Sequence, residues 1–149
     1  MPNTFSNLLF HIVFSTKERR KLLSKELRVR LFKYMSGIAD KSNFKIIKLG
    51  GIDDHIHLLF SLSPDMPVAK AVQLIKGNSS KWLRENFTDL DIFSWQVGYG
   101  AFTVSKSQID IVQKYIANQE EHHKKMSFEE EFVELLKRNK IDFDYKYLF

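Results

Sequence analysis

The sequence contains no cysteine, only three prolines and six glycines, and no long apolar run. Without cysteine there is no disulfide framework, cysteine-ligated zinc site, iron–sulfur cluster or thiol nucleophile. No apolar stretch approaches the roughly 20 residues that a membrane span needs, and the N-terminus lacks the basic and then apolar pattern of a signal peptide. We therefore expect a soluble, cytoplasmic protein with no membrane partner.

The composition and length indicate a globular chain. Of its 149 residues, 44% are apolar and 28% are charged, which excludes a disordered or collagen-like protein. A chain of this length typically forms one domain, so we expect a single domain over residues 1–149.

Positive charge is concentrated at the start of the chain. Residues 1–50 contain 11 Lys or Arg and only three Asp or Glu, whereas the net charge of the whole chain is +5. A segment of this kind is typical of proteins that bind a polyanion, most commonly nucleic acid. A solvated helix face would have the same composition.

The apolar periodicity alternates between strand and helix patterns. We expect strands at about 7–15, 44–49, 55–62, 92–97 and 101–104. We expect helices at about 24–39, 67–83, 107–124 and 127–138, with Ser24, Ser107 and Ser127 as caps and a disturbance at Gly77-Asn78. The order is β-α-β-β-α-β, followed by a tyrosine-bearing helix and one further helix. It predicts an α+β fold with a ferredoxin-like (RRM-like) antiparallel sheet, helices on one face and the other face free. The aromatic tail, 141–149, is expected to dock on another surface.

Two histidines, His55 and His57, alternate on the third expected strand. Alternate strand residues share a face, so both imidazoles point the same way and Ile56 points the other way, into the core. Two imidazoles about 7 Å apart along a strand can converge on one metal ion. The alternative is a pair of exposed histidines on a solvated face. His11, His122 and His123 are interpreted as a sheet histidine and two helix-end histidines.

Tyr115 and Gln119 are four residues apart on an expected helix and therefore share one face at the border between core and water. A phenol can act as a nucleophile, and an amide oxygen can ligate a hard metal ion. The alternative is a boundary tyrosine with its hydroxyl in solvent.

Two groups of side chains suit nucleic-acid contact. Basic residues of the loop after the first strand suit phosphate contacts, as do basic and hydroxyl residues beside Trp82 on the second helix. The candidate DNA-binding residues are Lys17, Arg19, Arg20, Lys76, Ser79, Ser80 and Lys81. The alternative for the second group is an ordinary helix surface with a buried tryptophan.

Four segments in this order carry a family resemblance. They are His-Ile-His at 55–57, Ser-Ser-Lys-Trp at 79–82, Gly-Tyr-Gly at 98–100 and Tyr-Ile-Ala-Asn-Gln at 115–119. The chain resembles, over nearly its whole length, the single-tyrosine HUH transposases of the IS200-like insertion-sequence family. The resemblance implies that His55, His57 and Gln119 bind a divalent cation, usually Mg²⁺ or Mn²⁺, and that Tyr115 is the nucleophile.

The resemblance also implies an activity and its partners. Members are homodimers in which the tyrosine helix of one subunit can complete the site of the other. They recognise single-stranded DNA hairpins at the element ends, and they cut and rejoin the DNA nearby through a 5′-phosphotyrosine intermediate. Two other functions are compatible with the same residues. One is a domesticated, non-catalytic protein that binds single-stranded DNA or hairpins, and the other is a metal-dependent phosphodiesterase that uses water.

Overall fold

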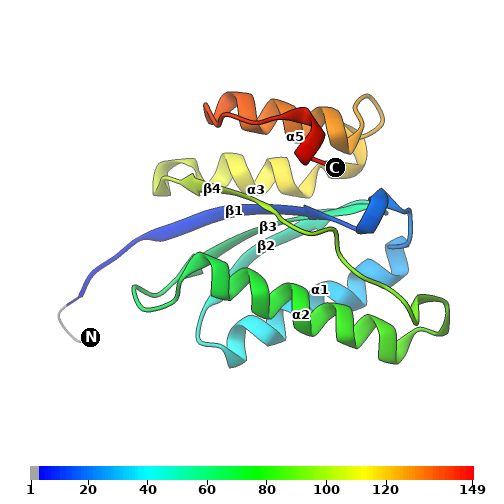
Figure 1. Cartoon of the computed structure of the whole chain (residues 1–149). Helices are drawn as coiled ribbons and strands as arrows, with labels where there is room; N and C mark the ends of the chain where they lie inside the picture. The colour runs from blue at the N-terminus through cyan, green and yellow to red at the C-terminus, as the bar shows by residue number, and fades with distance from the viewer. Residues whose placement is uncertain (1–3) are drawn as a thin grey trace.

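The computed structural model describes residues 4–149, and these form one sheet with helices on both of its faces (Figure 1). The strands of this part are β1 (Leu8–Ser15), β2 (Lys45–Gly51), β3 (His55–Leu62) and β4 (Gly100–Val104). Its α-helices are α1 (Lys25–Lys41), α2 (Val68–Asn86), α3 (Ile109–Ala117), α4 (Gln119–His122) and α5 (Phe128–Arg138). Short 3₁₀ segments lie at Lys17–Arg19, Thr88–Leu90, Lys106–Gln108 and Tyr145–Tyr147.

The sheet has the strand order β2-β3-β1-β4, and every neighbouring pair is antiparallel. This is the order of a ferredoxin-like sheet, so the predicted α+β class is confirmed. The central strands β1 and β3 pair with Val13 opposite His57 and Ser15 opposite His55. The two predicted site histidines therefore lie on a central strand near one end of the sheet.

Helices α1 and α2 cover one face of the sheet (Figure 1). Ser24 caps α1 as predicted, because its hydroxyl accepts the backbone N–H of Leu27 at 3.3 Å. Helix α2 runs without interruption, so the predicted disturbance at Gly77-Asn78 is wrong. The Asn78 amide donates to the carbonyl of Leu74 at 2.9 Å, one helical turn earlier, and does not interrupt the helix.

The predicted strand at 92–97 is also wrong. This segment is a loop with one β-bridge, between Trp95 and Thr16. The Trp95 indole packs edge-on against Phe14 at 4.8 Å and against Phe93 at 4.9 Å between ring centroids. Phe93 and Trp95 thus pack into the core as single side chains, whereas Ile92 and Val97 are exposed. The next expected strand, 101–104, is present as β4.

The predicted helix over 107–124 is interrupted. Helix α3 ends at Ala117, Asn118 has φ −101° and ψ 22°, and the one-turn helix α4 starts at Gln119. Asparagine is a weak helix former, which favours the break at this position. Ser107 does not cap α3; it lies in the preceding 3₁₀ segment, and its hydroxyl pairs with that of Ser105 at 3.1 Å.

The second face of the sheet is covered and not free, which corrects the prediction. Figure 1 shows α3 and α5 on the side of the sheet opposite α1 and α2. Helix α3 lies on β2 and β3. Helix α5 has the predicted Ser127 capping box and packs over β1 and β4. The contact is made by Val13, Phe102, Phe128, Leu135 and Leu136.

The tail docks in part on this second core. Phe143 and Leu148 pack against the cluster under α5, whereas Tyr145 and Tyr147 are 63% and 79% exposed. Docking of the tail is therefore confirmed for two of its apolar side chains. Within residues 4–149, none of the helices combines the length and the apolar character that crossing a bilayer requires.

Candidate metal and tyrosine site

The predicted histidine pair is fully buried. Strand β3 directs His55 and His57 to the face under α3 and α5, while Ile56 lies in the core on the other face. Both histidines have 0% exposure, and their ring centroids are 5.0 Å apart. The alternative of two solvated histidines is therefore wrong, because the covering helices exclude water from this face.

Helix α3 approaches the sheet very closely at Gly50 of β2. A Cβ atom at this glycine would lie 2.1 Å from the carbonyl oxygen of Ile116, so only glycine fits here. The approach places the neighbouring Tyr115 against the strand histidines, with ring centroids 5.6 Å apart for His57 and 5.9 Å for His11.

Gln119 follows the break in the helix and is 1% exposed. Its amide donates to the carbonyl of Tyr115 at 3.2 Å, and its Oε1 lies 3.1 Å from Nε2 of His55. One chain thus brings together all four residues that the sequence singled out: His55, His57, Tyr115 and Gln119.

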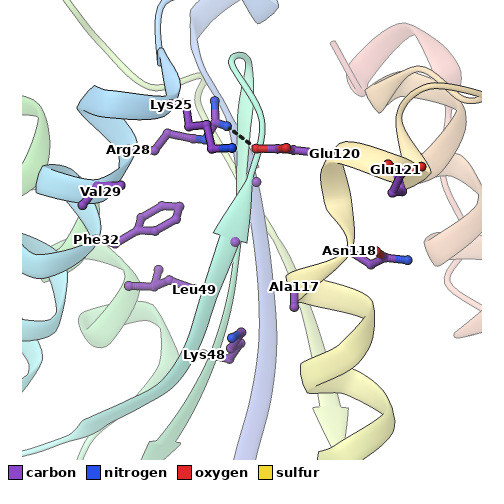
Figure 2. Close-up of a pocket in the computed structure, with 12 residues that line it drawn as sticks. Lys25, Arg28, Val29, Phe32, Lys48, Leu49, Ala117, Asn118, Glu120 and Glu121 are labelled. Carbon is purple, nitrogen blue, oxygen red and sulfur yellow. Dashed lines mark hydrogen bonds and ion pairs between the residues drawn. The ribbon is translucent and has the colours of Figure 1, made fainter.

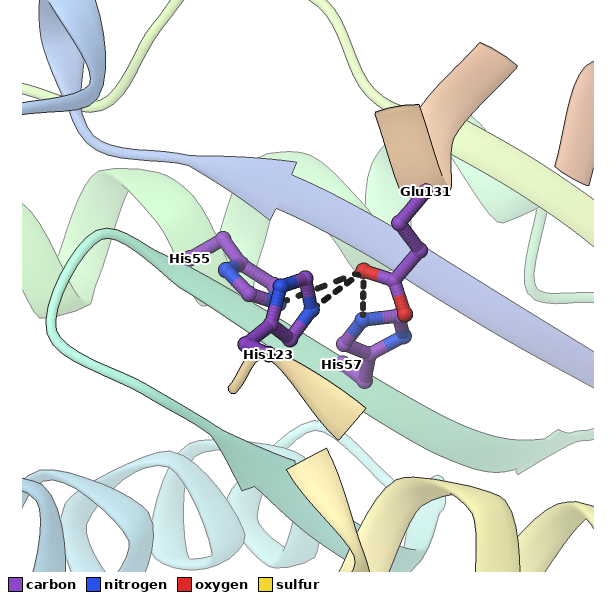
Figure 3. A group of neighbouring side chains, drawn as sticks. All are labelled: His55, His57, His123 and Glu131. Atoms are coloured by element: carbon purple, nitrogen blue, oxygen red, sulfur yellow. Dashed lines mark hydrogen bonds and ion pairs between the residues drawn. The ribbon is translucent and has the colours of Figure 1, made fainter. Parts of the chain in front are cut away.

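Two further residues, His123 and Glu131, join this group (Figure 3). Oε1 of Glu131 lies 3.0 Å from Nε2 of His57, 2.9 Å from Nε2 of His123 and 3.4 Å from Nε2 of His55. From the sequence, His123 is expected only as a histidine at a helix end, and Glu131 is not among the predicted site residues. A usable signal was present: Glu131 lies on the apolar face of α5, between Phe128 and Leu135, where a carboxylate is out of place.

The second ring nitrogen of each site histidine has its own partner. Nδ1 of His55 lies 2.8 Å from Oδ1 of Asp54, and Nδ1 of His123 lies 2.7 Å from the carbonyl oxygen of Met126. Nδ1 of His57 lies 2.8 Å from Nε2 of His11. These contacts fix the orientation of each ring and direct each Nε2 atom toward Glu131.

Burial and hydrogen bonding set the charges of the cluster. Burial alone would lower the pKa of His55, but its bonds to Asp54 and Glu131 outweigh burial and raise this pKa to about 9. Burial lowers the pKa of His57 to about 4. Burial alone would raise the pKa of Glu131, but bonds from His123, His55 and His57 hold it far below its ordinary range. The cluster therefore contains an ionised carboxylate paired with a charged His55.

The hydroxyl of Tyr115 donates to Oε2 of Glu131. Burial, followed by the negative charge of this carboxylate, raises the pKa of the phenol above its ordinary range. In this arrangement Tyr115 is a neutral phenol. Ionising it as a nucleophile requires additional positive charge nearby.

The side chains present fit a divalent cation. The ligand atoms of His55, His57, His123 and Glu131 all lie within 4.8 Å of one another, and all four residues come from the described part of the chain. Imidazole nitrogen together with carboxylate and amide oxygen forms a donor set that divalent ions accept. The His/Glu cluster can therefore hold the metal that the family resemblance implies.

A separate pocket of about 380 Å³ lies outside this cluster, between α1, β2 and the junction of α3 with α4 (Figure 2). Arg28 and Glu120 form an ion pair of 3.0 Å across it, and the Arg28 guanidinium also donates to the carbonyl of Leu23 at 2.7 Å. This pair links α4 to α1 and so helps to hold the segment that carries Gln119 and His123.

Comparison with known proteins identifies the family of this chain. The sequence pattern described as "Transposase IS200 like" matches residues 4–119. The chain belongs to the IS200-like transposase family. It is 33% identical over 129 residues to the transposase for insertion sequence element IS200 of Salmonella typhimurium, which covers 83% of this chain and 84% of that protein. It is 28% identical over 119 residues to the ISDra2 transposase TnpA of Deinococcus radiodurans, over 75% of this chain and 84% of that protein.

Solved structures agree with this assignment. The crystal structure of a putative transposase from Deinococcus radiodurans matches 78% of the chain and 94% of its own length, with a TM-score of 0.64 and 25% identity. A REP-associated tyrosine transposase bound to a REP hairpin matches 75% of the chain and 66% of its own length, with a TM-score of 0.58 and 15% identity. The second likeness shows the fold alone. Membership of the IS200-like transposases supports a DNA transposase function.

In this IS200-like transposase, the predicted DNA-contacting residues of the loop after β1 remain near the surface. Lys17 and Arg20 are exposed, and Arg20 lies 3.3 Å from Glu18. Arg19 is partly buried and lies 3.5 Å from Glu129 of α5. The loop therefore presents positive charge beside the helix that carries Glu131.

The predicted residues on α2 divide into two groups. Lys81 is exposed, whereas Lys76 is partly buried and donates to the carbonyls of Gln96 at 2.7 Å and Gly98 at 2.8 Å. Ser79 is 0% exposed and accepts the indole N–H of Trp95 at 3.0 Å. Ser80 is 9% exposed and donates to the carbonyl of Gly77 at 3.1 Å. In this structure the Ser79 hydroxyl is therefore engaged with Trp95 and the Ser80 hydroxyl with its own helix, and the assignment of both to DNA contact stays a prediction.

Proposed function

We propose that this chain, as a single domain over 1–149, cuts and rejoins single-stranded DNA at the ends of an insertion sequence through a covalent 5′-phosphotyrosine at Tyr115. One observation carries the proposal. The Tyr115 phenol lies beside a converging set of buried donors that includes His55, His57 and Gln119. Such a combination of nucleophile and metal-ligating groups suits phosphoryl transfer.

The chemistry assigns distinct roles to these side chains. His55, His57 and Gln119 would hold Mg²⁺ or Mn²⁺, which would polarise the scissile phosphate and offset its charge. Tyr115 Oη forms a bond to the phosphorus as the bond from the phosphorus to the 3′-oxygen breaks. The proton that the phenol loses is matched by the proton that the departing 3′-oxygen takes up to become a 3′-hydroxyl. The ester retains the bond energy, so a later 3′-hydroxyl can attack it and rejoin the strands without ATP.

The DNA partner and the assembly are part of the same proposal. The REP-associated transposase that shares the fold is bound to a REP hairpin, and we propose that this chain likewise recognises hairpins at element ends, as a homodimer in the cytoplasm. Lys17, Arg19, Arg20, Lys76 and Lys81 supply the positive charge for the phosphates.

The test uses labelled single-stranded oligonucleotides from the DNA flanking the gene, incubated with protein and Mg²⁺ or Mn²⁺ and run on denaturing gels. We expect a band of protein-plus-DNA mass that chelator abolishes and that Tyr115→Phe lacks. Tyr147→Phe is the matched control, because this tyrosine is 79% exposed and remote in sequence from the cluster. Cleavage by Tyr115→Phe would favour the water-using phosphodiesterase. Hairpin binding with neither cleavage nor adduct would favour the domesticated binding protein.

A further inference from the structure

His123 and Glu131 lie outside the stretch that matches the family, which ends at residue 119. They nevertheless share the central position of the cluster with the strand histidines (Figure 3). Glu131 is 1% exposed, and the side chain of His123 is 3% exposed. A carboxylate buried to this degree needs either several hydrogen-bond donors or a cation.

The contacts of His123 favour a cation. Its Nδ1 lies 2.7 Å from the Met126 carbonyl, which can only accept, so Nδ1 carries a hydrogen. Its Nε2 faces Oε1 of Gln119 and Oε1 of Glu131, both at 2.9 Å, so a hydrogen on Nε2 would be shared between two acceptors. A metal ion placed between these three atoms satisfies all of them at once.

The spacing of the donor atoms also favours a cation. Neighbouring ligands of an octahedral ion bound at about 2.1 Å lie about 3 Å apart. In the cluster, the Nε2 atoms of His55, His57 and His123 lie 2.9–3.4 Å from Oε1 of Glu131. Each of these rings is also held through Nδ1 by a second group, as is usual for histidines that bind a metal.

Glu131 connects the three histidine Nε2 atoms with Tyr115. Its Oε1 faces the three histidines, while its Oε2 accepts the Tyr115 hydroxyl. The buried Nε2 of His122 lies 3.4 Å from the same Oε2 and makes no hydrogen bond within residues 4–149. Buried polar atoms without partners point to a missing ion or water.

We propose that His123 and Glu131 are ligands of the metal centre, so that one chain supplies three imidazoles, an amide oxygen and a carboxylate oxygen. Glu131 then joins the metal to the nucleophile, with one oxygen on the ion and the other on the Tyr115 hydroxyl. The inference rests on the proposed function only for the presence of a metal at His55 and His57.

Mn²⁺ binding to the full-length, metal-free protein tests the inference without DNA. The free ion is measured by electron paramagnetic resonance, and pulsed spectra count the imidazole nitrogens on the bound ion. We expect three imidazoles in the wild type and two in His123→Asn. We also expect Glu131→Gln and His123→Asn to weaken Mn²⁺ binding by about tenfold or more, as loss of a metal-supporting residue commonly does. Glu134→Gln is the matched control, because this glutamate lies on the same helix and pairs with Arg138 on the surface.

Two imidazoles in the wild type would overturn the inference, as would unchanged affinity in both variants. Circular dichroism of each metal-free variant checks its fold, and the nitrogen count of the wild type decides the question even if a variant fails to fold. An adduct at Tyr115 combined with only two imidazoles would refute the inference and leave the proposed function standing. Three imidazoles without any adduct would support the inference and count against the proposed function.

Discussion

Replacing Gly50 by alanine tests whether the close approach of α3 to β2 positions the nucleophile. The added methyl group would lie 2.1 Å from the carbonyl oxygen of Ile116 and 2.8 Å from its Cγ2. Since real contacts of this kind exceed 3 Å, α3 must move away from the sheet by about 1 Å. Overpacking of this kind costs about 1–3 kcal/mol, or roughly 3–10 °C in melting temperature for a chain of this size.

The same shift should affect adduct formation more strongly than stability. Tyr115 is bonded directly to Ile116 in sequence, so it moves with the helix, and a displacement of about 1 Å at a reacting group can slow a reaction about 100-fold. The assay is single-turnover formation of the covalent protein–DNA species at a temperature where both proteins are folded, with urea unfolding run in parallel.

Gly37→Ala is the control for this experiment. Gly37 lies within α1, and an added Cβ has no atom within 4 Å, so we expect a gain of about 0.5–1 kcal/mol and unchanged adduct formation. If Gly50→Ala matches the wild type in both stability and single-turnover rate, the contact does not position Tyr115 and the argument is refuted.

Three further predictions concern the cap of α5, the basic loop and the metal. Ser127→Ala should lower the free energy of unfolding by about 1 kcal/mol in urea melts, because it removes the capping box of the helix that carries Glu131, whereas Ser107→Ala, which caps no helix, should not. Changing the three basic side chains of the 17–20 loop to glutamine should weaken hairpin binding. It should also reduce the slope of the logarithm of the binding constant against the logarithm of the salt concentration by about 2, because each lost phosphate contact contributes about 0.7. Ser79→Ala should leave this slope unchanged, since its hydroxyl is buried against Trp95, and an altered slope would contradict that assignment. If three imidazoles bind the metal, Mn²⁺ should bind at least about tenfold tighter than Mg²⁺ in a competition titration, because nitrogen ligands favour transition ions.

The core of the fold was predictable because its signals are local. An apolar run rich in strand-forming residues identified β1, and helical spacing with a serine cap identified α1. The loop at 92–97 was mistaken for a strand because buried aromatics such as Trp95 and Phe93 produce the same apolar pattern without a ladder. The break at Asn118 could not be read from apolar periodicity, because residues 118–125 contain no apolar side chain.

The covering of the second sheet face depends on how distant segments pack. Helices α3 and α5 are amphipathic, but the sequence does not specify which surface the apolar side of each helix covers. Val13 and Phe102 are buried because α5 folds back over β1 and β4. The folding of α5 back over β1 and β4 explains why His55 and His57 are fully buried. In a sheet with helices on one face only, both side chains would be exposed to water.

The site shows the same division between local and long-range information. The strand period places His55 beside His57, and the family motif adds Tyr115 and Gln119. His122 and His123 are adjacent and chemically identical in the sequence, yet their side chains are 30% and 3% exposed. The difference arises because the chain turns at residues 123–125, which brings the Met126 carbonyl and then Glu131 to the ring of His123. A histidine becomes a candidate ligand here through the path of the backbone between α4 and α5, which no spacing rule within 122–131 specifies.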